Sequence, residues 1–359
     1  MNRMLVFGLA TSSAATNAYH IGTPGTPWGA AERAQWLSER TVSRSYDSMV
    51  RSRIDALQDR FNVEEYGSLS HDPERYPLFC LKSRTWSPEL PNVLITGGVH
   101  GYETSGVLGA LSFLEDHGEW YASRCNILVA PCVSPWAFET VQRWNAAAID
   151  PNRSFQSRDL PKTAAIDPTT AWRGAAASIC AEESVALMRL VESVGVREWH
   201  CHVDLHETTD SDEGEFIPAR AASNGIQHEP ATAPGQVPDG FYVVGDSGTR
   251  LTHGEQGSFL KAVVDAVRKV THIAPADENG QIIGEPVTQE GAIMYPYTEL
   301  GLCGSVTSRF EGVVGAAYAC TTEVYPDSPT ATGEECTEAQ VACVNAAIDF
   351  MLARRGPSA

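Results

Sequence analysis

The sequence predicts an α/β fold, a three-layer α/β/α sandwich whose central twisted sheet is mixed and mostly parallel. Apolar runs of strand length alternate with helical patterns along the whole chain, which is the order of elements that produces this class. The chemically distinctive side chains follow these apolar runs. This is the position at which α/β sheets bind ligands, outside the carboxyl ends of their strands.

The elements are expected in the following order. After a lead rich in glycine and proline, residues 30–61 predict one or two helices with charged outer faces. Apolar runs predict strands at 77–82, 92–96, 126–131, 199–205, 241–244 and 317–324. Periodic patterns predict helices at 105–117, 179–194 and 258–270. Thr337 and Gln340 have the spacing of a capping box and predict the start of a last helix that ends near Ala353.

The sequence shows no internal repeat and no clean linker, so residues 26–359 are predicted to form a single domain after an N-terminal segment, 1–25. Arg3 precedes a short apolar run, as in a weak secretory signal. An unprocessed and loosely ordered N-terminus is the alternative. The location therefore stays open between the cytoplasm and a secreted or periplasmic site.

Composition excludes two classes of partner. The 359 residues carry a formal net charge of −19 and no run of lysine and arginine, which argues against a nucleic-acid partner. No apolar run approaches the roughly 20 residues of a membrane span.

The nine cysteines lack tight spacing, so buried free thiols are expected rather than a disulfide framework. The oligomeric state is not readable.

The most informative motif lies between a predicted strand and a predicted helix, in the string Gly97-Gly98-Val99-His100-Gly101-Tyr102-Glu103. A histidine and a carboxylate three residues apart at such a turn can reach one metal ion. Zinc accepts both ligand types, and a catalytic zinc site has three protein ligands and a water. The alternative interpretation is a loop histidine beside a carboxylate that the helix dipole favours.

Further candidates follow along the chain. His206 ends the strand predicted at 199–205, and Asp204 on the same strand face could orient a histidine. Glu323 stands near the end of an apolar strand, where a carboxylate requires a role or a partner. It is interpreted as a general base, with a buried ion pair as the alternative.

Two arginines suit the recognition of a substrate. Arg153 follows Asn152 after a rigid Asp-Pro turn, and the guanidinium with its neighbouring amide can grip a carboxylate. Arg143 lies ten residues earlier and could face a carbonyl that becomes an oxyanion.

Taken in order, these motifs resemble the zinc carboxypeptidases of the carboxypeptidase A-like clan, to which the succinylglutamate desuccinylase and aspartoacylase branch is related. The resemblance spans roughly residues 92–329. It implies one zinc ion (Zn²⁺) per chain, bound by His100, Glu103 and His206. It also implies that Glu323 is the base and proton shuttle, that Arg143 polarises the scissile carbonyl, that Asn152 and Arg153 bind the substrate carboxylate, and that Tyr295 or Tyr297 closes over the substrate.

The implied function is that of a zinc metallocarboxypeptidase. It would hydrolyse the C-terminal amide bond of a peptide or peptide-like substrate with a free carboxylate, by Glu-assisted attack of zinc-bound water. The first alternative is an N-acyl amino acid deacylase of the aspartoacylase or succinylglutamate desuccinylase type. The short stretch after Glu323 leaves no room for the β-rich C-terminal module that group tends to carry. The second alternative is a catalytically silent binding module.

The side-chain preference of the substrate stays open. An arginine at position 309 would favour acidic substrates, whereas an acidic cluster from Asp210 to Glu215 would favour cationic ones.

Overall fold

The computed structural model describes residues 19–155, 180–226, 237–247, 251–295, 303 and 316–355. Within this part of the chain, eight strands form one sheet in the order β1-β2-β4-β3-β5-β10-β6-β9. The strands are β1 (Phe61–Ser68), β2 (Pro77–Ser83), β3 (Asn92–Gly97), β4 (Asn126–Ala130), β5 (Cys201–Glu207), β6 (Tyr242–Asp246), β9 (Ala292–Tyr295) and β10 (Tyr318–Val324). A separate small hairpin pairs β7 (Gln281–Ile282) with β8 (Glu285–Pro286).

The sheet is mixed and mostly parallel, as predicted. Its four central strands, β4, β3, β5 and β10, run in the same direction. On one side β2 is antiparallel to β4 and β1 is antiparallel to β2. On the other side β6 is antiparallel to β10, and β9 is parallel to β6. The carboxyl ends of the four central strands therefore meet at one edge of the sheet.

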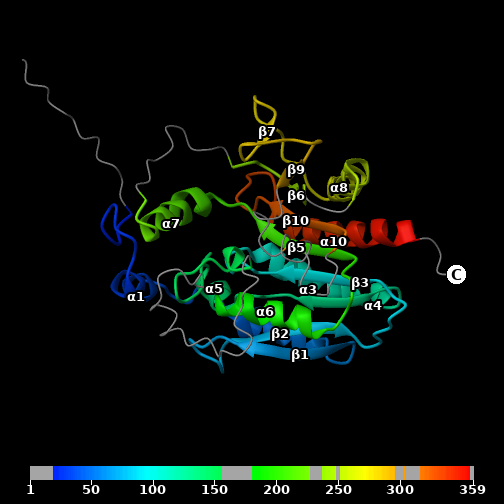
Figure 1. The fold of residues 1–359 in the computed structure, drawn as a ribbon, viewed down its shortest axis with the longest axis horizontal. Coiled ribbons are helices and arrows are strands. Elements are labelled where there is room, and N and C mark those ends of the chain that lie inside the picture. Colours follow the sequence, from blue (N-terminus) through cyan, green and yellow to red (C-terminus); the bar gives the residue numbers. More distant parts are fainter. Residues whose placement is uncertain are drawn as a thin grey trace, which may run out of the picture.

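Helices cover both faces of the sheet (Figure 1). The α-helices are α1 (Ala30–Ser38), α2 (Ser52–Ala56), α3 (Thr104–Asp116), α4 (Gly118–Ala122), α5 (Pro135–Thr140), α6 (Glu182–Ser193), α7 (Ile217–Ser223), α8 (His253–Val267) and α10 (Gly333–Arg355). Shorter helical turns are η1 (Asp47–Arg51), η2 (Pro151–Arg153) and η3 (Asp212–Phe216).

Alternation along the strands divides the apolar side chains into two cores. In β3, Val93 and Ile95 belong to the core beneath α3, α8 and α10, whereas Leu94 belongs to the core beneath α6. This division follows from the two-residue period of a strand, which sends neighbouring side chains to opposite faces. The three-layer arrangement expected from the sequence is therefore present.

Several boundaries differ from the sequence-based expectation. The strand β1 was not expected, because its many exposed positions hide the apolar pattern of an edge strand. The last helix begins at Gly333 rather than at Thr337, since Thr332 and Glu335 form the capping box. Gln340 is not a capping residue but lies fully buried inside α10. Both pairs have the same spacing, so the pattern alone could not separate them.

Two further segments lie outside the sheet. The polar stretch after β5 contains η3 and α7, and residues 19–28 lie against α7, where Trp28 N donates to Ser223 O at 3.0 Å. No helix in the described ranges is both long and apolar enough to cross a membrane.

Candidate metal centre and active site

The ends of three neighbouring strands carry the central candidate residues. His100 and Glu103 lie in the turn that joins β3 to α3, His206 is the penultimate residue of β5, and Glu323 is the penultimate residue of β10. His206 and Glu323 are register partners on adjacent parallel strands, so their side chains leave the sheet on the same side. Residues more than 200 positions apart in the sequence are thereby brought to one edge of the sheet.

Close packing shapes the turn that carries His100 and Glu103. A Cβ atom on Gly101 would lie 2.1 Å from the backbone of Ala137, so only glycine fits against α5 here. Arg44 holds the same turn from outside, since its Nη2 donates to Gly101 O at 2.6 Å and its Nη1 to Thr104 Oγ1 at 2.5 Å. This role of Arg44 could not be predicted from the sequence, because its two partners lie 57 and 60 residues away along the chain.

The three predicted metal ligands converge. Their ligand atoms all lie within 4.8 Å of one another, and all three side chains are buried. Glu103 Oε1 is 2.7 Å from His100 Nδ1, and Glu103 Oε2 is 2.9 Å from His206 Nδ1. The second nitrogen of each histidine ring contacts an aspartate. His100 Nε2 is 3.2 Å from Asp150 Oδ1, and His206 Nε2 is 3.0 Å from Asp204 Oδ2.

This arrangement fits a divalent cation. A metal-binding histidine commonly gives its second nitrogen to a carboxylate, which fixes the ring and its tautomer. Here both Nδ1 atoms are directed toward Glu103. Glu103 Oε2 is buried and, although His206 Nδ1 is close, the pair lacks hydrogen-bond geometry and no other described residue supplies a donor. A buried carboxylate oxygen in this state suits a shared ion better than a direct ion pair.

The charges at the site agree with this interpretation. Burial alone would raise the pKa of Glu103, but His206 and His100 outweigh it and lower that pKa to about 2. Burial alone would lower the pKa of His206, but Glu103 and Asp204 raise it well above its usual value. A cation bound among these groups would take the place of the proton on His206.

The expectation that Asp204 orients a histidine is confirmed by its contact with His206 Nε2. Its second oxygen accepts from Thr96 Oγ1 at 2.6 Å, and this hydroxyl lies 3.0 Å from His202 Nε2. His202 therefore belongs to a supporting network and is not part of the ligand cluster. His200 Nδ1 accepts from Asn92 N at 3.0 Å, which also keeps it apart from the cluster.

Glu323 has the surroundings of a proton acceptor. Burial raises the pKa of its carboxyl to about 8, the charge of His206 opposes this rise, and that of Glu103 adds to it. Thr208 Oγ1 donates to Glu323 Oε2 at 2.9 Å and lies 2.8 Å from the hydroxyl of Tyr242. The side chain is thus oriented by Thr208, in the loop that follows β5. Among the residues that the structure describes, its side-chain hydrogen bond comes from this hydroxyl and not from a cation.

Arg143 is held between two carboxylates. Its Nε donates to Asp150 Oδ2 at 3.1 Å, and its Nη1 donates to Asp212 Oδ1 at 3.1 Å and to the hydroxyl of Tyr102 at 3.4 Å. Because Asp150 also contacts His100, one carboxylate links the predicted oxyanion arginine to the ligand cluster. The sequence did not identify Asp150, Asp212 and Tyr102 as site residues. The only signals were the position of Asp150 beside Asn152 and the acidic cluster around Asp212.

The predicted carboxylate-binding pair lies in η2, beside the ligand cluster. Asp150 caps this turn, since its Oδ1 accepts from the backbone of Asn152 at 2.9 Å and of Arg153 at 3.3 Å. Asn152 is buried and Arg153 is exposed. Tyr295, at the end of β9, lies close enough to Arg153 to interact with it electrostatically. Tyr297 lies outside the described residues, as does the arginine at position 309.

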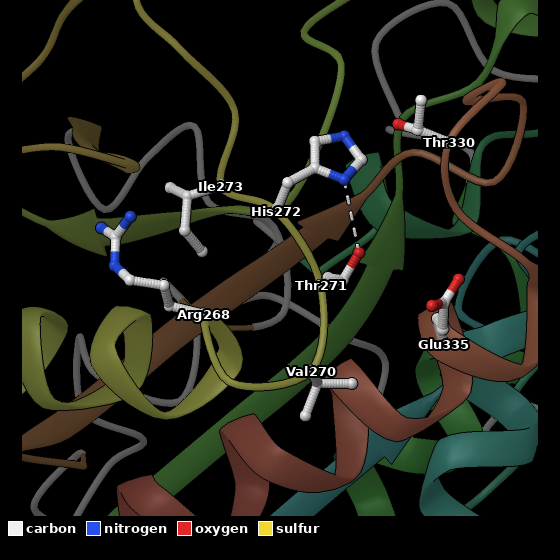
Figure 2. A pocket seen from close by; sticks show the side chains of 7 residues that line it. All are labelled: Arg268, Val270, Thr271, His272, Ile273, Thr330 and Glu335. Atoms are coloured by element: carbon white, nitrogen blue, oxygen red, sulfur yellow. Dashed lines mark hydrogen bonds between the residues drawn. The ribbon is translucent and has the colours of Figure 1, made fainter.

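A hollow elsewhere on the surface is lined by none of the predicted site residues (Figure 2). It lies beside the loop that follows α8 and the first turns of α10. Its lining residues are Arg268, Val270, Thr271, His272, Ile273, Thr330 and Glu335. His272 is bonded through Nε2 to Asp239 Oδ1 at 2.9 Å, which ties this loop to the residues before β6.

Comparison with known proteins supports the fold and identifies a segment similar to a known catalytic-domain family. Residues 89–229 match the succinylglutamate desuccinylase/aspartoacylase catalytic domain family. This range contains every predicted site residue except Glu323 and the two tyrosines. No curated protein matches the chain by sequence.

Solved structures share the fold at low sequence identity. A candidate metallopeptidase from Shewanella amazonensis SB2B is 19% identical, with a TM-score of 0.60 over 87% of this chain and 99% of the other. A metallo-carboxypeptidase from Burkholderia cenocepacia is 16% identical, with a TM-score of 0.52 over 92% and 70%. Carboxypeptidase A from Helicoverpa armigera is 11% identical, with a TM-score of 0.52 over 96% and 78%.

The family match over residues 89–229 and the shared fold agree with the resemblance found in the sequence. The chain thus has a carboxypeptidase-like fold, and its residues 89–229 are similar to the succinylglutamate desuccinylase/aspartoacylase catalytic domain.

Proposed function

We propose that this protein is a zinc-dependent metallocarboxypeptidase that hydrolyses an amide bond next to a free carboxylate. The observation that carries the proposal is the convergence of His100, Glu103 and His206 within 4.8 Å, on the same edge of the sheet as Glu323. A ligand triad, a carboxylate of raised pKa and an arginine pair in one region are the parts that this reaction needs. The complete set also argues against a catalytically silent binding module.

Each residue has a proposed task. Glu323 accepts a proton from the attacking water and returns it to the leaving amine, for which its raised pKa is suitable. Arg143, held by Asp150 and Asp212, stabilises the developing oxyanion. Zinc, when bound, supplies a Lewis acid and lowers the pKa of water.

The substrate carboxylate is proposed to bind at Asn152 and Arg153. Arg153 is exposed, so its guanidinium is accessible to a ligand, while the backbone beneath it is fixed by Asp150. A guanidinium forms paired hydrogen bonds with a carboxylate. Tyr295, in electrostatic range of Arg153, is proposed to close over the bound substrate. The same role of Tyr297 stays a prediction.

The second candidate is an N-acyl amino acid deacylase, which is favoured by the family match over residues 89–229. The same ligands, base and carboxylate clamp would serve it, since both substrates carry an amide beside a carboxylate. The two candidates differ in the acyl side of the substrate. A comparison of kcat/KM for short peptides and for N-acyl amino acids decides between them, and the larger value identifies the natural class.

The carboxylate clamp predicts that a peptide with a free C-terminus is cleaved and that its C-terminally amidated form is not. Arg153→Ala should lower kcat/KM for the free peptide by about 10- to 100-fold, because a hydrogen bond to a charged group contributes about 1.5–3 kcal/mol. Steady-state kinetics with the two peptides measures both effects. Arg268→Ala removes an exposed guanidinium outside the site and serves as the matched control. Equal cleavage of the free and amidated peptides would refute the clamp.

A further inference from the structure

Gln340 is an unusual side chain for the middle of a helix that packs on a sheet. It lies in α10, is fully buried and shares its surroundings with apolar residues of the core beneath that helix. Burying an amide is unfavourable unless its donors and acceptor are all bonded. The structure satisfies this condition in a way that involves the candidate site.

The amide of Gln340 closes a ring of hydrogen bonds with the backbone of His206. Gln340 Nε2 donates to His206 O at 2.9 Å. Thr322 Oγ1 donates to Gln340 Oε1 at 2.6 Å, and the same hydroxyl accepts from His206 N at 3.2 Å. Both backbone groups of the predicted ligand are therefore bonded to one linked pair of side chains, Gln340 and Thr322.

The same amide reaches the two other strand ends of the site. Its Nε2 lies 3.4 Å from Ser105 Oγ, in the first turn of the helix whose N-cap is Glu103. Thr322 immediately precedes the proposed base Glu323. Gln340 thus contacts all three segments that carry the ligand cluster and the base.

Packing fixes the position of this amide. A Cβ atom on Gly109 would lie 2.5 Å from Gln340 Cβ, so α3 and α10 are in direct contact at this point. Glu207 provides a second link between the same segments, since its carboxylate accepts from Ser105 N at 2.6 Å and from Thr104 N at 3.1 Å. The turn after β3 and the end of β5 are therefore joined from behind by buried polar groups.

We propose that Gln340 is a positioning residue that sets the geometry of the metal centre and of Glu323 from the C-terminal helix. This inference rests on the proposed function, because it assumes that His206 binds a metal ion. Residues behind the ligands orient them, and their loss commonly lowers metal affinity by about 10- to 100-fold. Glutamine is required because the ring needs one donor and one acceptor on the same side chain.

The test is the zinc affinity of Gln340→Met, measured by competition with a chromophoric chelator. Methionine has a similar length and removes both polar atoms, so zinc should bind about 10- to 100-fold more weakly than to the parent. The d–d absorption of the cobalt-loaded variant should differ from that of the parent, and kcat should fall with little change in KM. These readouts separate positioning from a purely structural role.

Gln256→Met is the matched control. Gln256 is also buried, lies in α8 on the same face of the sheet, and donates through Nε2 to a backbone carbonyl at a strand end, Asp246 O. This described hydrogen bond involves none of the three segments around Gln340. Its replacement should lower thermal stability but leave zinc affinity and the cobalt spectrum as in the parent.

Thr322 provides a second and independent test. Thr322→Val should weaken zinc binding as Gln340→Met does, whereas Thr322→Ser keeps the hydroxyl and should restore it. The double variant Gln340→Met/Thr322→Val should be little weaker than either single variant, because both break one network. If Gln340→Met fails to fold, the valine and serine variants decide the question.

The outcomes separate this inference from the proposed function. If Gln340→Met and Thr322→Val bind zinc as tightly as the parent protein does, the positioning role is overturned and the proposed function stays intact. A parent that binds zinc but cleaves no amide would overturn the proposed function only. A parent that binds no zinc would overturn both.

Discussion

Glu323→Gln is expected to lower kcat for amide hydrolysis by about 10²- to 10⁴-fold, the usual contribution of a positioned general base. Glutamine keeps the size of the side chain and can still accept from Thr208, but it cannot take up a proton. Zinc content and KM should stay close to those of the parent. Steady-state kinetics with metal analysis of the same samples provides the measurement.

The pH profile adds a second readout of the same substitution. Burial raises the pKa of Glu323 to about 8, and a cation bound at His206 would lower it from that value. Since the base works as a carboxylate, kcat/KM should fall as the pH falls through this pKa. The acidic limb should disappear in Glu323→Gln. Retention of parental kcat in this variant would exclude Glu323 as the base.

Arg143→Lys is expected to lower kcat by about 10²- to 10³-fold, because the loss of one oxyanion donor has an effect of this size. Lysine keeps the charge but has no planar fork, so it cannot contact Asp150 and Asp212 as the guanidinium does. Activity assays at saturating substrate measure the loss.

The matched control for this substitution is Arg53→Lys. Arg53 also contacts a carboxylate, that of Glu115, but lies outside the candidate site. It should have the activity of the parent. If Arg143→Lys behaves like the control, Arg143 does not stabilise the transition state.

The positions of the principal candidates were predictable because they depend on local patterns. An apolar run followed by a glycine-rich turn predicts the end of β3, and a histidine or glutamate near the end of another apolar run marks β5 or β10. Parallel strands then bring their carboxyl ends to one edge without further information. The order of His100, Glu103, His206 and Glu323 was therefore sufficient to suggest one site.

The supporting contacts were not predictable, because they join residues far apart in the chain. Asp150 contacts a histidine 50 positions away, Asp212 contacts an arginine 69 positions away, and Gln340 contacts a carbonyl 134 positions away. No local period specifies such pairs, since they depend on how helices and loops pack on the finished sheet. For Gln340 the local pattern was misleading, because it has the spacing of a helix cap.

The central claim is that His100, Glu103 and His206 hold one zinc ion. Calorimetric titration of metal-stripped protein with zinc tests it most directly, with the parent and His206→Ala compared under the same conditions. The parent should bind one zinc ion per chain, and the variant should bind it far more weakly, because a catalytic zinc site relies on three protein ligands. A folded parent that takes up no zinc, or a variant that binds it as tightly as the parent, would contradict the claim.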